Sequence, residues 1–108
     1  MAGIFDRVIR TGSETDSPIG SLTLWACVYA VGRGIATGAQ VAAKLDEQLG
    51  DQPLTGPEKA DLNAILAHAQ TGTATQRIDY MLRLQSILIA TETGLIQSEA
   101  TFRAELGI

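Results

Sequence analysis

The stretch 74–93 constrains the fold more than any other part of the chain, because it predicts a long helix with both ends marked. Thr73 can cap its start, and Gln76 completes a capping box with that threonine. Gly94 supplies the left-handed residue that commonly follows the end of a helix. A helix that is apolar on most sides is covered by several neighbours, so we expect this one at the centre of a bundle. Its apolar side chains spread over more than half of the circumference: Tyr80, Met81, Leu82, Leu84, Ile87, Leu88 and Ile89.

Shorter helices are predicted on either side of this central one. Thr55 and Glu58 form a second capping box, and Pro57 lies in the first turn, where its missing N–H costs nothing. Ser21 can cap the helix expected at about 21–31, and Ser98 can cap the last helix. No stretch shows the alternation of a β-strand. The sequence therefore predicts an all-α fold, a single compact bundle of five to six helices around helix 74–93. The shorter helices are expected at about 2–10, 21–31, 37–49, 55–71 and 98–106.

The composition is that of an ordinary globular domain, with 108 residues and 45% apolar side chains. Cys27 is the one cysteine, which excludes an internal disulfide and a cysteine-based metal cluster. One histidine adds little to the ligands that zinc prefers. We therefore predict no metal, no cofactor and no small-molecule substrate. The net charge of −4, without a run of like charges, argues against a nucleic-acid-binding surface.

Residues 1–18 read as an N-terminal arm, and residues 19–108 as the helical domain. The short helix of the arm carries an apolar stripe of four residues, Ile4, Phe5, Val8 and Ile9, and a polar tract follows at 11–18. Such a helix is too short to be stable alone, so it has to dock on its own domain or on a neighbouring subunit. The sequence leaves both possibilities open. In the second case the four apolar residues are interface residues. The first residues also lack the apolar segment of a signal peptide, so we expect a chain that is not secreted.

Segment 21–31 is apolar enough to raise the question of a membrane helix. Its apolar part is about 15 residues long, shorter than the ~20 that a spanning helix needs. A buried core helix is the preferred interpretation, and no membrane association is expected. Trp25 and Tyr29 lie one turn apart in it. Such a pair usually belongs to a core, but in an assembling protein aromatic residues also anchor interfaces, so both are candidate interface residues.

Catalytic patterns are absent from the sequence. It contains no phosphate-binding loop, no dinucleotide fingerprint and no zinc-protease motif. His68 as a base would need an orienting carboxylate, and Cys27 as a nucleophile would sit within an apolar helix, where thiols are usually inert. Asp46, Glu47 and Asp51 are acidic neighbours but lack the alternating oxygen ligands of a calcium loop. The sequence therefore predicts that the protein is not an enzyme.

Residues 34–50 have the look of the second half of a helix-turn-helix. A recognition helix presents basic or amide side chains to base edges. Here only Gln40, Lys44 and Gln48 could do so, beside acidic neighbours that would repel phosphate. A small helix-turn-helix regulator or protein-interaction module therefore remains the alternative function.

Residues 54–108 resemble the small helical proteins encoded in the structural modules of tailed bacteriophages and prophages. The shared features are a helical hairpin rich in threonine and alanine, a long apolar helix, and a short terminal helix ending in Leu-Gly-Ile. The resemblance includes no diagnostic motif and carries over no site residue. It implies a non-enzymatic structural or assembly protein that is present in many copies in a virion. Such a protein self-associates and binds neighbouring virion proteins. Its expected location is the virion or the host cytoplasm.

Overall fold

Six helices and no strand make up the part of the chain that the structure, a computed structural model, describes: residues 3–8 and 19–108. The all-α bundle predicted from the sequence is confirmed. Residues 2, 9 and 10 of the predicted first helix lie outside the described residues. The helices are α1 (Ile4–Val8), α2 (Ser21–Gly32), α3 (Gly38–Leu49), α4 (Gly56–Gln70), α5 (Ala74–Glu92) and α6 (Glu99–Leu106).

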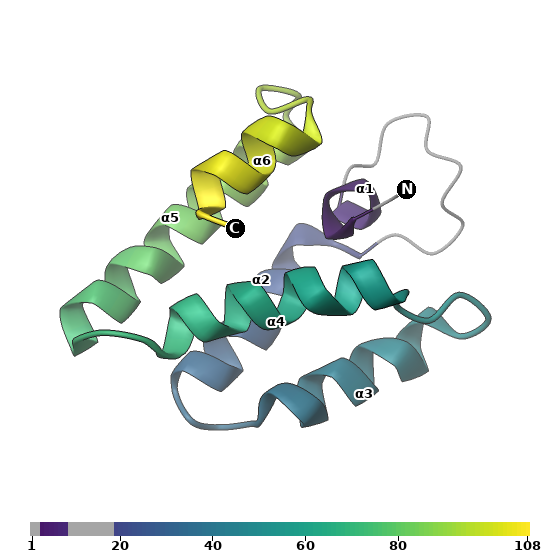
Figure 1. Ribbon diagram of the computed structural model, residues 1–108, viewed down its shortest axis with the longest axis horizontal. Helices are drawn as coiled ribbons and strands as arrows, with labels where there is room; N and C mark the ends of the chain where they lie inside the picture. Colours follow the sequence, from purple (N-terminus) through teal and green to yellow (C-terminus); the bar gives the residue numbers. More distant parts are fainter. Residues whose placement is uncertain (1–2, 9–18) are drawn as a thin grey trace.

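The centre of the bundle is shared by three helices, α2, α4 and α5, which pack against one another. Figure 1 shows α4 crossing the middle of the molecule, with α2 behind it and α3 along its lower side. Helix α6 lies on α5, and the short α1 contacts α4, α5 and α6. The long helix α5 is thus one of three central elements, and one of its faces is left uncovered. No helix within the described residues is long and apolar enough to cross a membrane.

Local side-chain contacts fix where most helices begin. The hydroxyl oxygens of Thr55 and Thr73 accept hydrogen bonds from the backbone N–H of Glu58 and Gln76, so both predicted capping boxes are confirmed. Ser98 caps α6 in the same way, by accepting from the N–H of Thr101. Gly94 has a φ of 82°, as expected of a residue that stops a helix.

The start of α2 differs from the sequence-based prediction. Ser21 was expected to cap this helix, but the capping position is Gly20, and no side chain caps the helix there. Ser21 is the first helical residue, and its hydroxyl is buried without a hydrogen-bond partner among the described residues. The packing of α2 against its neighbours therefore sets this end, because no local capping bond does.

Helix α1 is part of the hydrophobic core of its own chain. The side chains of Ile4 and Val8 are fully buried, and Phe5 is nearly so. The Phe5 ring lies 5.0 Å from the ring of Phe102 in α6, centroid to centroid. The helix of the N-terminal arm is therefore docked on its own domain in this structure, and not on a neighbouring subunit. Its apolar face closes the core over α4, α5 and α6.

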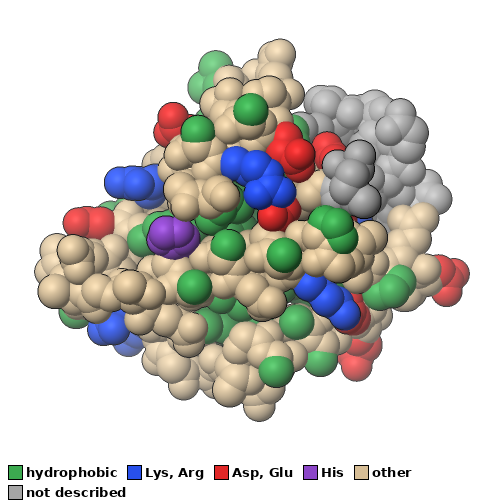
Figure 2. Space-filling view, viewed as in Figure 1, with side chains coloured by type: hydrophobic (Ala, Val, Ile, Leu, Met, Phe, Trp, Pro, Cys, Tyr) green, Lys and Arg blue, Asp and Glu red, His purple; other side chains and the backbone are tan. Residues whose placement is uncertain are grey.

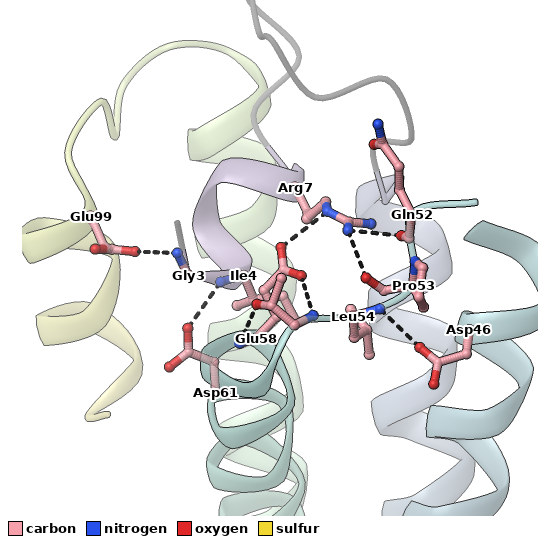
Figure 3. A network of polar contacts seen from close by, with 11 residues as sticks. Gly3, Ile4, Arg7, Asp46, Gln52, Pro53, Leu54, Glu58, Asp61 and Glu99 are labelled. Carbon is pink, nitrogen blue, oxygen red and sulfur yellow. Dashed lines mark hydrogen bonds and ion pairs between the residues drawn. The ribbon is translucent and has the colours of Figure 1, made fainter. Parts of the chain in front are cut away.

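Polar contacts hold α1 in place from two sides (Figure 3). On one side, backbone N–H groups at the start of the helix donate hydrogen bonds to carboxylates. The N–H of Gly3 donates to Glu99 over 3.1 Å, and the N–H of Ile4 donates to Asp61 over 2.9 Å. Asp61 also binds Arg103 of α6, with both carboxylate oxygens within 2.9 Å of one guanidinium nitrogen. Negative charge at the start of a helix is favourable, so these acids stabilise an element that is too short to be stable alone.

On the other side, Arg7 reaches away from α1 to α4 and to the loop before it (Figure 3). Its Nε atom lies 3.0 Å from a carboxylate oxygen of Glu58, with both side chains almost completely buried. A further guanidinium nitrogen donates to the carbonyl oxygens of Gln52 and Pro53. This pairing could not be predicted from the sequence, because its members are far apart along the chain.

Tyr80 supports a prediction about alkaline pH. Its hydroxyl is buried without a hydrogen-bond partner among the described residues. Burial raises the pKa of Tyr80 from 10.0 to about 12, although the nearby charge of Arg83 lowers it in part. The unfolded chain therefore loses this proton first, and the stability that the neutral phenol supports is full below pH 10.0 and falls as pH rises through about 12.

We expect Tyr80→Phe to raise the free energy of unfolding by about 1 kcal/mol at neutral pH, because it removes an unpartnered hydroxyl. It should also remove the part of the alkaline destabilisation that comes from this residue. Urea unfolding of both proteins at neutral pH and across the alkaline range measures the two effects. Equal alkaline losses in the two proteins would contradict the assignment to Tyr80.

Candidate functional site

The residues predicted as an interface fall into two groups in the structure. Ile4, Phe5 and Val8 are buried in the core of their own chain, so in this arrangement they are not offered to a neighbour. Ile9 lies outside the described residues. On α2, Trp25 is half-buried against the core, and Tyr29 is 37% exposed.

Trp25 and Tyr29 form one wall of an open groove between α2 and α5. Their rings stack, with centroids 5.1 Å apart and planes 19° from parallel. The indole N–H of Trp25 donates to the carbonyl oxygen of Met81 over 3.2 Å, which ties this wall to α5. The α2–α5 groove has a volume of about 470 Å³. Its lining is mostly apolar and comprises Trp25, Tyr29, Gly32, Arg33, Ala69, Ala74, Arg77, Ile78, Met81 and Leu82.

Two arginines give this apolar groove a positive edge. The guanidinium of Arg33 lies 5.6 Å from the ring centroid of Tyr29 and donates to the Tyr29 hydroxyl over 3.2 Å. Arg77 lies on the opposite wall, on α5. Among the described residues, the ion pairs use other cations, and neither Arg33 nor Arg77 pairs with an acid. The groove thus suits an apolar group that carries a carboxylate.

The outer face of α5 continues the apolar surface beyond the groove. Ile78 is 60% exposed, and Leu82 and Ile89 are each 56% exposed. At 100° per residue these three positions share one face of the helix, which we call the α5 stripe. The sequence predicted that α5 would be covered on most sides, and for this face the prediction is wrong. The core side of the helix is Tyr80, Leu84, Ile87, Leu88 and Thr91.

The candidate catalytic residues do not come together in the structure. Cys27 lines a separate shallow groove between α2 and α3, and burial raises the pKa of its thiol, which keeps it protonated. His68 is at the surface of α4, where its ring stacks on Tyr80 and one ring nitrogen lies 3.2 Å from the carbonyl oxygen of Gly107. Among the described residues no hydrogen bond joins the Cys27 thiol to the His68 imidazole, so this pair lacks the contact that a nucleophile and its base need.

Two of the three acidic residues around the end of α3, Asp46 and Glu47, have structural partners. Asp46 accepts a hydrogen bond from the N–H of Leu54 over 2.9 Å and lies 3.5 Å from the ammonium of Lys59. Glu47 pairs with Lys44 at the surface. Among the described residues no group of three or more histidine, cysteine or acidic side chains could hold a metal ion.

The helix-turn-helix hypothesis concerns α2, the turn after it and α3. Gln40, Lys44 and Gln48 are exposed on α3 and line the α2–α3 groove, and Lys44 is engaged with Glu47 at 3.3 Å. On the face drawn in Figure 2, acidic and basic side chains of the described residues are intermingled, with no continuous basic patch. The recognition-helix role of α3 stays a hypothesis without an electrostatic feature in its favour.

Comparison with known proteins adds no relative: no protein family model, no curated protein and no solved structure matches this chain. The surface of the chain itself is therefore the basis for its function. Among the described residues, the α2–α5 groove and the adjoining α5 stripe form a composite site. Sequence reasoning identified Trp25 and Tyr29 in it but not Arg33, Arg77 or Ile78. A helical projection of 74–93 does show that Ile78, Leu82 and Ile89 share a face, but not that this face is exposed.

Proposed function

We propose that this chain is a non-enzymatic structural or assembly protein of a phage particle, present in many copies. In this proposal it acts by self-association and by binding neighbouring virion proteins, and it resides in the virion or, before assembly, in the host cytoplasm. One observation carries the assembly role: the exposed α5 stripe, which continues into the α2–α5 groove.

The exposed apolar side chains of α5 are the physical basis of this role. Single exposed apolar side chains are normal on a protein surface, but several on one helix face beside an apolar groove indicate an interaction site. Ile78 and Leu82 belong to both the stripe and the groove wall, so the two features form one surface. Covering apolar surface contributes ~25 cal/mol per Å² before the ordering costs of association. Trp25 and Tyr29 add aromatic side chains of the kind that anchor interfaces.

The assignment to a phage particle rests on the resemblance of residues 54–108, which correspond to α4, α5 and α6 with the loop before them. The dispersed positions of Cys27 and His68 favour a binding role over catalysis. The same surface would also serve a protein-interaction module outside a virion. Self-association is therefore the step to test first.

We expect light scattering to give a mass above the 11.4 kDa of one chain, rising with protein concentration. Leu82→Lys should shift the mass back toward one chain, because it places a charge on the stripe while leaving the core untouched. Ile35→Lys is the matched control, since Ile35 is 72% exposed but lies in the turn after α2. A wild-type mass that stays at one chain across the concentration range would contradict self-association.

A titration with duplex DNA separates the alternative function. A structural protein should show no binding that depends on sequence. A monomer or dimer that binds duplex DNA with a steep salt dependence would favour the regulator instead.

A further inference from the structure

We infer that α5 pairs with the α5 helix of a second copy of this chain, antiparallel, about a two-fold axis that passes between Leu82 and Gln85. The inference rests on the proposed self-association and gives it a partner, a direction and a register. The order of apolar and charged side chains along α5 supports this pairing.

The apolar residues of the α5 stripe are placed almost symmetrically about that axis. Ile78 and Ile89 are about three turns apart, or about 16 Å along the helix. Leu82 and Gln85 lie between them on the same face. When two such helices pair antiparallel, Ile78 of each copy lies opposite Ile89 of the other, and the two middle positions meet at the axis. Both exposed isoleucines are then covered by a single contact.

The charges beside the stripe favour the same direction. Arg77 and Glu92 flank it at opposite ends of α5, and neither has an ion-pair partner among the described residues. Within one chain they are about 22 Å apart along the helix, too far to meet. Antiparallel pairing about a two-fold axis brings like flanks together, so Arg77 of each copy approaches Glu92 of the other. Parallel pairing would instead put the two Arg77 side chains on opposite sides of the contact and leave each of them about 22 Å along the helix axis from Glu92 of the other copy.

The α2–α5 groove receives the end of the second helix in this arrangement. Arg77, Ile78 and Leu82 line the groove, so Ile89 of the second copy arrives at its mouth with Glu92 close behind. The positive edge and apolar lining of the groove thus match the side chains that the partner helix presents. A contact of this kind uses the same surface on both copies and closes at two. The pair is then the unit from which a larger particle is assembled through other surfaces.

A charge exchange tests the pairing directly. Arg77→Glu and Glu92→Arg should each weaken dimerisation by about tenfold, because each creates two like-charge contacts per dimer. The double variant should restore the wild-type dissociation constant to within about threefold. Each substitution places its new charge favourably relative to the helix dipole, so the fold is expected to be preserved, with circular dichroism as the check. Since the two positions cannot meet within one chain, restoration has to come from contact between copies.

Cross-linking provides a second measurement that does not depend on affinity. In a Cys27→Ser background, Gln85→Cys should be linked between copies by a short bismaleimide, because this position adjoins the axis. Arg83→Cys is the control, since Arg83 is exposed at nearly the same height but on another face of α5.

The outcomes separate this inference from the proposed function. A wild-type chain that is monomeric at every concentration overturns both. A wild-type chain that associates, with no rescue in the double variant and equal cross-linking at the two positions, overturns the α5 pairing and leaves self-association to another surface. Rescue together with cross-linking at Gln85→Cys alone supports the antiparallel dimer.

Discussion

Replacing Ile4, Phe5 and Val8 together by alanine is expected to remove about half or more of the free energy of unfolding of this fold. The three side chains are 0%, 4% and 0% exposed, and they close the core over α4, α5 and α6. Replacing a buried isoleucine or phenylalanine by alanine costs about 2–5 kcal/mol each, so the triple variant should lose about 7 kcal/mol. Domains typically have only about 5–15 kcal/mol of stability in total. Circular dichroism and urea unfolding measure the loss.

The chain contains a matched control for this experiment. Leu22, Ile35 and Leu95 are of similar size but 77%, 72% and 82% exposed. Replacing these three by alanine should change the free energy of unfolding by less than about 1 kcal/mol, measured at a concentration where the chain is monomeric. If the two triple variants unfolded at the same urea concentration, α1 would not be part of the core.

The burial of α1 in the core changes what an assembly experiment with variants of the N-terminal arm measures. On the sequence alone, Phe5 could have served a neighbouring subunit, and its substitution would then report on assembly. Because the structure buries Phe5 against Phe102, loss of assembly in a Phe5 variant would report unfolding instead. Surface positions such as Leu82 separate the two effects, since their side chains contribute little to the core.

Features that depend on neighbouring residues in the chain could be predicted from the sequence. The capping boxes of Thr55 and Thr73 are examples, because each joins residues three apart and needs no other helix. The start of α2 could not be predicted in this way. Ser21 has a capping side chain, yet the packing of α2 places it inside the helix.

The candidate site shows the limit of periodicity. The spacing of Ile78, Leu82 and Ile89 shows that they share a face, but any face of an apolar helix can be the exposed one. Which face stays open depends on where α2, α4 and α6 pack, and that is decided by contacts between distant segments. Trp25 could be predicted as a candidate because aromatic residues favour interfaces wherever they are exposed. Arg77 could not, because its importance comes from the groove beside it.

The ion pair between Arg7 and Glu58 could not be predicted from the sequence, because the two residues are far apart along the chain. Breaking this ion pair should strongly lower the stability of the fold. The two side chains are 7% and 2% exposed, with 3.0 Å between Nε and the carboxylate. Glu58 also accepts the N–H of Thr55 over 2.8 Å, so one carboxylate both caps α4 and neutralises the guanidinium from α1. Removing one member of such a pair leaves the other charge buried without its counterpart.

Arg7→Met alone should therefore lower the free energy of unfolding by about 3–5 kcal/mol, and Glu58→Gln should have a similar effect. The double variant should lose much less than the sum, because neither charge then remains, giving a coupling energy of about 2 kcal/mol in urea unfolding. Lys44 and Glu47 provide the control cycle on the same chain: their side chains are 66% and 74% exposed. Lys44→Met with Glu47→Gln should show coupling below about 0.5 kcal/mol, since water screens an exposed pair. Additive losses at Arg7 and Glu58 would mean that the buried pair is held by its backbone hydrogen bonds and not by the attraction between its charges.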